Sequence, residues 1–167
     1  MFESFVRRQY LASLPLLLLF VSEVLASELQ QRIDAARPGD TLDVRSGVYV
    51  GNLVLRRRVS LIGEENAVLR GDGTGSVITI AADSCTVSGF TVERCGRMLA
   101  DDDAGILILS SHNRVERNVL RDVMFGVYLR GADSNLIAGN TITGRKELQF
   151  GDRGSGIHLW NSNGNVL

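Results

Sequence analysis

The feature that most constrains the fold is a set of short apolar segments that recur along the chain in a fixed order. Each copy begins with a β-type segment, at residues 76–80, 105–108, 126–129 and 156–159. A second segment follows each of these at nearly constant distance, at residues 85–87, 113–115, 135–137 and 165–167. The step from Asn113 to Asn135 is 22 residues, and the other steps of 28 and 30 residues indicate insertions of six and eight residues.

An earlier copy and a third column extend the repeat. Residues 59–63 match residues 85–89, and Phe90, Asn118 and Asn140 each precede a further β-type pair. A step near 22 residues that contains several short strands is typical of a β-solenoid, in which each coil covers the next. Strands of successive coils then pair in parallel sheets. A leucine-rich solenoid is disfavoured, because the spaced leucines and the helical half of that repeat are missing.

Alternation along each strand assigns the side chains to two faces. The predicted inward residues are Ile106, Ile108, Val127, Leu129, Ile157 and Leu159, and the predicted outward residues are Leu107, Tyr128 and His158. Asn113, Asn135 and Asn165 fall at one corner, where stacked amides can satisfy the turn backbone. We therefore predict an all-β fold, a parallel β-helix.

Residues 1–26 have the order of features of a signal peptide. Arg7 and Arg8 precede an apolar run that is too short to span a bilayer. Small or branched residues then lead up to Ala26, which is the predicted cleavage site. A twin-arginine signal and an amphipathic helix are the alternatives, and ordinary export to the periplasm is favoured. Residues 27–167 are then predicted to form the β-helix domain.

The two ends of this domain are expected to differ. Ser27 can cap a helix in which Leu29, Ile33 and Ala36 share one face and which ends at Pro38. We expect this helix to cover the open edge of the first coil. The chain stops inside a strand segment at residues 165–167, and we therefore expect it to be a fragment that lacks later coils.

Composition excludes some classes of function. The chain has 18 Lys and Arg against 19 Asp and Glu, and its formal net charge of -1 is unlike the basic footprint of a nucleic-acid binder. Removing the predicted signal peptide takes away two basic and two acidic residues, so the charge stays at -1. With 18 glycines and 2 prolines the chain is neither a linker nor a disordered segment.

Both insertions fall at the same corner of the predicted coil. The first covers approximately residues 94–104 and the second approximately residues 143–155. Their charged residues include Asp101, Asp102, Asp103, Asp152 and Arg153. Loops from stacked coils at one corner must lie side by side, and such insertions often build the binding face of a solenoid. The alternative is that both loops are solvated excursions without a function.

Several segments carry a resemblance to a known family. They are residues 35–42, 104–106, 125–132, 139–142 and 153–161. Together they resemble the NosD family, and the resemblance covers nearly the whole of residues 27–167. It implies a right-handed, periplasmic β-helix that works with an ABC transporter in assembling the copper site of nitrous oxide reductase. It also implies copper binding, and contact with a membrane only through a partner.

Residues that suit copper(I) are present without a recognisable ligand spacing. The thiol, thioether and imidazole groups of residues 27–167 are those of Cys85, Cys95, Met98, Met124, His112 and His158. Most such groups are structural when they stand alone, so no metal ligand is assigned and copper stays a possibility from the resemblance. Two alternatives stay open for Cys85 and Cys95: they form a disulfide, or they are separate residues of the core.

The outward residues distinguish the remaining functions. A polysaccharide lyase or hydrolase needs carboxylates on the outer face of stacked strands, and the predicted outward positions hold none. They hold an apolar stripe that includes Leu107, Leu109, Tyr128 and Trp160, which indicates a surface for protein contact. We predict a non-enzymatic maturation factor that binds partners through this stripe and the two corner loops. A sugar-cleaving or sugar-binding β-helix and a purely structural one are the alternatives.

Overall fold

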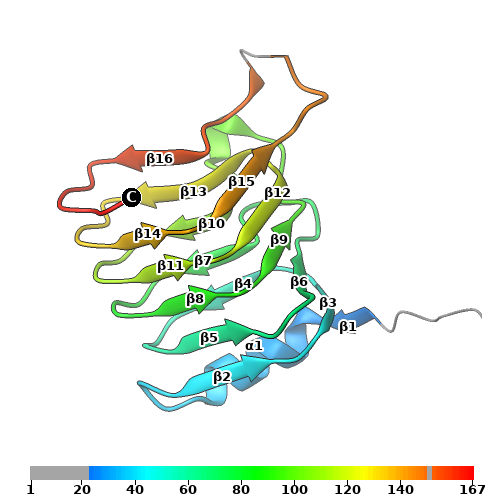
Figure 1. Cartoon of the computed structure of the whole chain (residues 1–167), viewed down its shortest axis with the longest axis vertical. Helices are drawn as coiled ribbons and strands as arrows, with labels where there is room; N and C mark the ends of the chain where they lie inside the picture. Colours follow the sequence, from blue (N-terminus) through cyan, green and yellow to red (C-terminus); the bar gives the residue numbers. More distant parts are fainter. Residues whose placement is uncertain (1–22, 150–151) are drawn as a thin grey trace, which may run out of the picture.

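Three parallel sheets run along the length of the computed structural model, which describes residues 23–149 and 152–167 (Figure 1). Sheet A contains β1 (Glu23–Leu25), β3 (Gly47–Val50), β6 (Ala67–Arg70), β9 (Thr91–Glu93), β12 (Val119–Val123) and β15 (Thr141–Gly144). Sheet B contains β2 (Thr41–Val44), β5 (Ser60–Gly63), β8 (Thr86–Ser88), β11 (Arg114–Glu116) and β14 (Leu136–Ala138). Sheet C contains β4 (Leu53–Leu55), β7 (Ile78–Ile80), β10 (Ala104–Ile108), β13 (Phe125–Arg130) and β16 (Ile157–Trp160).

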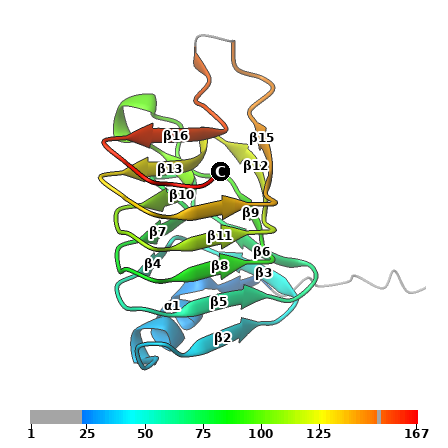
Figure 2. The ribbon, with the colours of Figure 1, turned by 60° about the vertical axis from the view of Figure 1, so that its left-hand side comes forward.

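The strand register confirms the repeat found in the sequence. Leu107 pairs with Thr79 below it and with Tyr128 above it, and Ser60 pairs with Thr86 as the match of residues 59–63 to 85–89 predicts. Every one of these pairings is parallel, and Figure 2 shows the coils stacked one above another. The fold is a right-handed parallel β-helix, as expected. The strands of the first coil, β2 to β4, were not identified from the sequence.

Alternation places the apolar side chains inside, as predicted for the central coils. Ile106, Ile108, Val127 and Leu129 are fully buried and stack on like neighbours in sheet C. In β16, the outermost strand of this sheet, Leu159 is 40% exposed. Burying a side chain of this size stabilises the fold by about 1.5–3 kcal/mol, so the stacked interior supplies most of the driving force for folding.

Amide side chains form two ladders at two corners of the coil. In the first ladder, the Oδ1 atom of Asn135 accepts two hydrogen bonds from Asn113, one from its backbone N–H and one from its side-chain amide. Asn135 is bonded in the same way to Asn165, which confirms the predicted ladder. A second ladder links Asn118 to Asn140 at the next corner. Each ladder gives the backbone of a tight turn its partners, so the corners repeat without bulky side chains.

A helix covers the first coil, as the sequence predicts. This helix, α1 (Ala26–Ala35), packs against β4 and buries Ala26, Leu29 and Ile33. It begins at Ala26, so its N-cap position is Leu25, and Ser27 lies inside the first turn, which corrects the predicted cap by two residues. In Figure 1, α1 lies at the lower end of the stack, near the level of β2.

The predicted signal peptide falls largely on residues 1–22, which lie outside the described residues. Its last residues are part of the fold, because β1 pairs with β3 through Val24 and Tyr49 and α1 begins at Ala26. Cleavage after Ala26, as the sequence predicts, would leave β3 as the first strand of sheet A. In the described part of the chain no helix is long and apolar enough to cross a membrane.

Candidate partner-binding face

The two corner loops lie against each other at the corner that joins sheet A to sheet C. We call residues 94–104 loop 1 and the described residues 143–149 and 152–155 loop 2. Arg145 of loop 2 is 3% exposed and donates to the carbonyl oxygens of Gly96 at 2.9 Å and Cys95 at 2.6 Å in loop 1. The Arg145 guanidinium also pairs with Asp122 at 3.0 Å, and Arg97 pairs with Glu147 at 3.5 Å. The prediction that the insertions lie side by side is confirmed.

The three consecutive aspartates of loop 1 have three different environments. Asp101 ends the short helix η1 (Leu99–Asp101) and is exposed. Asp102 is in the left-handed region, with φ of 58°, and its carboxylate pairs with Arg130 of β13 at 3.0 Å. Asp103 is 3% exposed and accepts the backbone N–H of Met98 at 2.9 Å. Two of the three carboxylates therefore fold the loop, and only Asp101 is presented to solvent among them.

Loop 1 is held over the outer face of sheet C, where the predicted apolar stripe lies. Tyr128 is on this face, stacked on Phe125 with ring centroids 5.1 Å apart and tilted against His158 at 4.8 Å. Tyr128 is only 5% exposed, and burial, together with the negative charge of Asp102, raises the pKa of its hydroxyl. Leu107 is half-buried. The expectation that the whole stripe is exposed is therefore wrong for Tyr128, which its neighbours cover.

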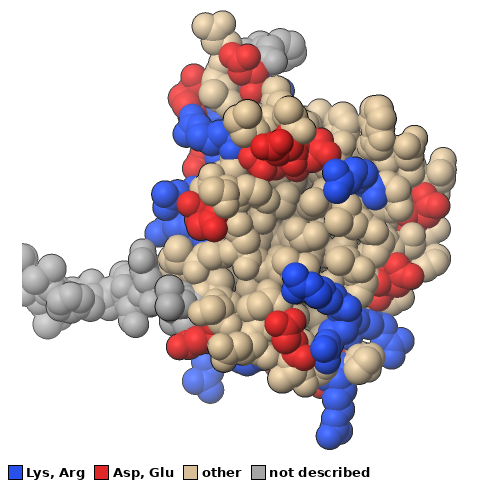
Figure 3. All heavy atoms as spheres, turned by 180° about the vertical axis from the view of Figure 1, so that it is seen from behind, with Lys and Arg blue, Asp and Glu red and all other residues tan. Residues whose placement is uncertain are grey.

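The apolar groups that do reach solvent on this side come from β16, loop 1 and the end of β10. Trp160 is 57% exposed, Met98 56%, Leu99 37% and Leu109 36%. Both ribbon views place η1 beside β16 (Figures 1 and 2). Figure 3 shows the molecule from the side opposite to Figure 1, with a mostly uncharged middle, a group of acidic side chains above it and a cluster of basic side chains at the lower right. We call Trp160, Met98, Leu99 and Leu109 the apolar patch.

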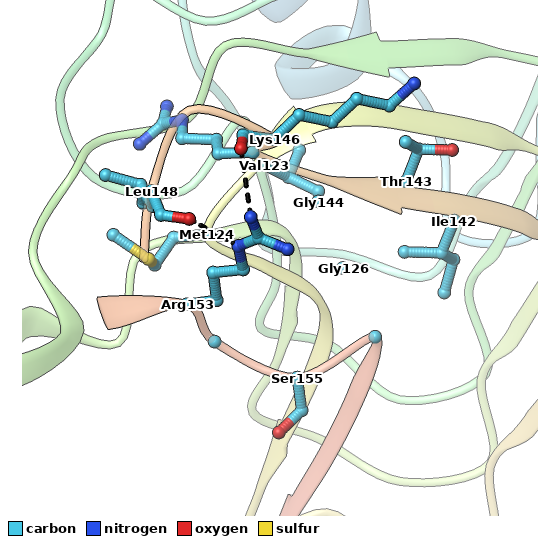
Figure 4. Close-up of a pocket in the computed structure, with 13 residues that line it drawn as sticks. Val123, Met124, Gly126, Ile142, Thr143, Gly144, Lys146, Leu148, Arg153 and Ser155 are labelled. Atoms are coloured by element: carbon cyan, nitrogen blue, oxygen red, sulfur yellow. Dashed lines mark hydrogen bonds between the residues drawn. The ribbon is translucent and has the colours of Figure 1, made fainter. Parts of the chain in front are cut away.

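Loop 2 closes a cavity of about 360 Å³ against the end of β12 and the start of β13. Arg153 donates to the carbonyl oxygens of Leu148 at 2.7 Å and Lys146 at 2.9 Å, and Figure 4 shows its guanidinium turned onto them. A Cβ on Gly154 would lie 2.5 Å from the Met124 carbonyl oxygen, so only glycine fits there. The Arg153 guanidinium thus bonds within its own loop and stabilises the conformation of that loop. Its neighbour Asp152 is exposed.

The sulfur and imidazole groups are dispersed. Cys85 and Cys95 are both buried free thiols, so the disulfide alternative is not formed. The Cys85 thiol bonds to the carbonyl oxygen of Arg57, and Cys95 Sγ accepts the N–H of Met124 at 3.1 Å. Burial raises the pKa of both thiols, which disfavours the thiolate that a soft metal prefers. His158 belongs to the aromatic stack, whereas His112 is exposed at a turn with φ of 60°.

No group of three or more His, Cys, Asp or Glu side chains within residues 23–149 and 152–167 is arranged to hold a metal ion. The central column on the outer face of sheet C also contains no carboxylate. Its residues, aligned by strand register, are Val54, Thr79, Leu107, Tyr128 and His158. The geometry that the described residues do form is a rigid solenoid wall with an apolar patch beside a folded loop. Such a wall is suited to contact with another macromolecule.

Sheet register, coil stacking and the helical cap define a right-handed parallel β-helix, and the comparisons agree. Residues 45–167 match the family described as the right handed beta helix region, and the chain belongs to this family. The chain is NosD-like. It is 34% identical over 137 residues to the "Probable ABC transporter binding protein NosD" of Pseudomonas aeruginosa, covering 75% of this chain and 32% of the relative.

A protein of the same name from Stutzerimonas stutzeri is 31% identical over 156 residues, covering 91% of this chain and 36% of that protein. The chain therefore spans about a third of the length of these curated relatives. No solved structure matches it. The family was anticipated from the sequence segments quoted above, and the matched range includes every strand from β3 onward.

Proposed function

We propose that the chain is part of a non-enzymatic accessory protein that is exported to the periplasm and binds subunits of an ABC transporter. Its role is to take part in assembling the copper site of nitrous oxide reductase. The names of the relatives support the association with a transporter. The resemblance of residues 104–106, 125–132 and 153–161 to the NosD family supports the role in maturation.

The observation that carries the proposal is the apolar patch on a rigid wall. Large apolar side chains that reach solvent together mark protein contact sites, and tryptophan is enriched among the residues that dominate binding energy. Trp160 lies on β16, which pairs with β13 along its whole length, and loop 1 is held by the ion pair between Asp102 and Arg130. A partner therefore meets a surface that needs little ordering on binding.

The same surface argues against a sugar-cleaving enzyme. Lyases and hydrolases on stacked strands need an acid and a base facing the substrate, and the acidic residues nearest sheet C are committed to other contacts. Asp102 pairs with Arg130 and Asp103 accepts a backbone N–H. A non-enzymatic role is consistent with this arrangement.

Copper handling is proposed to be shared with partner proteins. Cys85 is buried just before β8 of sheet B and Cys95 is buried just after β9 of sheet A, and each is bonded to backbone atoms. A soft ion held within this chain would require these groups to rearrange. The partners are accordingly expected to provide the ligands for the ion, and this wall is expected to position them.

Binding of purified chain to purified transporter subunits tests the proposal. We expect Trp160→Ala combined with Met98→Ala to weaken capture of the subunits by about tenfold or more, since exposed anchors of this size contribute about 1–2 kcal/mol each. Val119→Ala is the matched control, because Val119 is 43% exposed on sheet A. Failure of the wild-type chain to bind any subunit, together with cleavage of a polyuronate, would contradict the proposal.

A further inference from the structure

The corner between sheet C and sheet B follows a polar pattern in every coil above the first. Strand register aligns Asp83, Ser111, Asp133 and Asn163 in one column. The Asp83 carboxylate accepts the N–H of Ser111 at 2.7 Å, the Ser111 hydroxyl accepts the N–H of Asp133 at 3.1 Å, and the Asp133 carboxylate accepts the N–H of Asn163 at 2.7 Å. The side chains of Asp83, Ser111 and Asp133 thus each accept a bond from the coil above.

The first coil departs from this pattern with three consecutive arginines. Counting back from the pair of Ser60 with Thr86 places Arg57 below Asp83, with Arg56 and Arg58 on either side. A guanidinium has donors and no acceptor, so none of these side chains can cap a backbone N–H of the next coil. The requirements of the corner therefore do not explain this run of positive charge.

One arginine of the run has a structural role. Arg57 donates to the carbonyl oxygen of Ala36 at 3.1 Å, next to the end of α1, where a cation offsets the helix dipole. The Arg58 side chain packs on Gly39, because a Cβ added to Gly39 would lie 3.1 Å from the Nη2 atom of Arg58. The Gly39 N–H also donates to the Arg58 carbonyl oxygen at 2.7 Å. The turn that carries Arg37 is thereby brought beneath the arginine run.

Arg37, Arg56 and Arg58 are all exposed, and no ion pair in the described part of the chain includes them. The single carboxylate bonded within this turn is that of Asp40, which accepts the N–H of Arg37 at 2.8 Å. Figure 3 shows basic side chains gathered at the lower right, at one end of the face that carries the apolar patch. We call Arg37, Arg56 and Arg58 the arginine corner.

We propose that the arginine corner binds a carboxylate-rich segment of the protein partner and so sets the end at which that partner docks. The inference rests on the proposed function in taking the segment to belong to a protein partner. Guanidinium groups match the planar geometry of carboxylates and form paired bonds with them. Steering by such a cluster fixes orientation, whereas the apolar patch supplies the contact area.

A protein segment fits the corner better than an anionic lipid surface does. Basic membrane-binding surfaces pair their cations with apolar or aromatic groups that enter the interface. Strand register places Ala81 directly above Arg56, and the exposed apolar residue in this column, Leu109, lies a further coil away, so no large apolar residue adjoins Arg56 across the sheet. The corner is therefore an electrostatic contact without an apolar anchor.

The test measures binding of a fluorescently labelled decaglutamate peptide to the purified full chain by anisotropy at low salt. We expect the triple variant R37Q/R56Q/R58Q to raise Kd by about tenfold. The matched control R45Q/R94Q/K146Q removes as many exposed cations at other corners and is expected to change Kd by less than about twofold. Circular dichroism and Tm establish that both variants are folded.

Two further measurements decide between sources of negative charge and between the two proposals. Sedimentation with phosphatidylglycerol vesicles should pellet no protein, and W160A should leave the peptide Kd unchanged. Equal loss in both triple variants, no preference of the wild type for decaglutamate over decaglutamine, or vesicle binding that depends on the arginine corner would overturn the inference. Failure of transporter binding with intact, corner-dependent peptide binding would instead count against the proposed function alone.

Discussion

Two corners of this solenoid are built in opposite ways. At the corner between sheets C and B, short side chains repeat from coil to coil, and Asn113, Asn135 and Asn165 bond to one another and to the turn backbone. At the corner between sheets A and C, loops of different length meet through long charged side chains such as Arg145. The first corner sets the stacking of the coils, and the second accepts added residues without disturbing that stacking.

This difference explains where the candidate binding surface lies. In the coils above the arginine corner, where the asparagine ladder runs, this corner has its polar groups satisfied internally and offers little for a partner to bind. The loop corner carries the exposed Met98 and Leu99, and Asp102 of the same loop pairs with Arg130, which is the register partner of Trp160. Apolar contact with a partner is therefore expected on the irregular side, and the arginine corner of the first coil, which has no ladder, is expected to add an electrostatic contact. The following predictions separate the two corners, from the largest expected effect to the smallest.

The largest effect is expected at the ladder. Replacing Asn135 with Ala removes the acceptor of two bonds from Asn113 and leaves the backbone N–H of Asn113 buried without its partner. We expect the free energy of unfolding to fall by about 3 kcal/mol, measured by urea denaturation. Asn163→Ala is the control, since the Asn163 side chain is exposed. Equal losses in the two variants would show that the ladder is not what holds this corner.

A smaller and more local effect is expected at the loop corner. Arg145→Gln leaves the carboxylate of Asp122 and the carbonyl oxygens of Cys95 and Gly96 without their cation. We expect hydrogen exchange to rise in loops 1 and 2, with a global destabilisation of only about 1–2 kcal/mol. Lys146→Gln, a change at an exposed neighbour, should leave exchange unaltered. Uniformly faster exchange throughout the coils would contradict a separate role for this corner.

The smallest effect concerns Glu93, at the end of β9 where sheet A enters loop 1. Burial raises the pKa of its carboxyl, but hydrogen bonds and charge from Arg70 and Arg121, each at 2.7 Å, outweigh burial and hold that pKa below its ordinary value. A depressed folded pKa stabilises the fold above the unfolded pKa of about 4.3 and loses this contribution as the pH falls through the folded value.

We therefore expect Glu93→Gln to be less stable than the wild type at pH 7 by about 1 kcal/mol, and the difference to shrink below about pH 4. Thermal unfolding measured across this pH range checks the prediction. Glu65→Gln, at an exposed position, is the control. A difference that grows toward low pH would contradict the sign of the effect.

The fold could be predicted from the sequence because the repeat is a property of spacing. The copies around Asn113 and Asn135 have little inserted between them, so their columns align directly and the register follows. The earliest strands were missed because β2 to β4 belong to a shorter coil, in which Thr41 pairs with Ser60 only 19 positions away and no asparagine marks the corner.

The site was predicted only in outline. Spacing indicated that the loops share a corner, but it could not show that the Arg145 guanidinium would be buried between them, because no sequence signal distinguishes it from an exposed arginine. Alternation placed Tyr128 on the outer face correctly, and loop 1 folding back over that face then covered it. The arginine run at residues 56–58 was visible in the sequence, and it became informative only once the corner's column was known.

Hydrogen exchange of the chain with and without purified ABC-transporter subunits tests the central claim most directly. The account predicts slower exchange on binding in residues 97–101, 107–110 and 157–161, with little change at the ladder turns around Asn113 and Asn135. It also predicts partial protection at residues 56–58 that is lost at high salt. Protection confined to sheet B and its corners, with none in loop 1 or β16, would contradict the account.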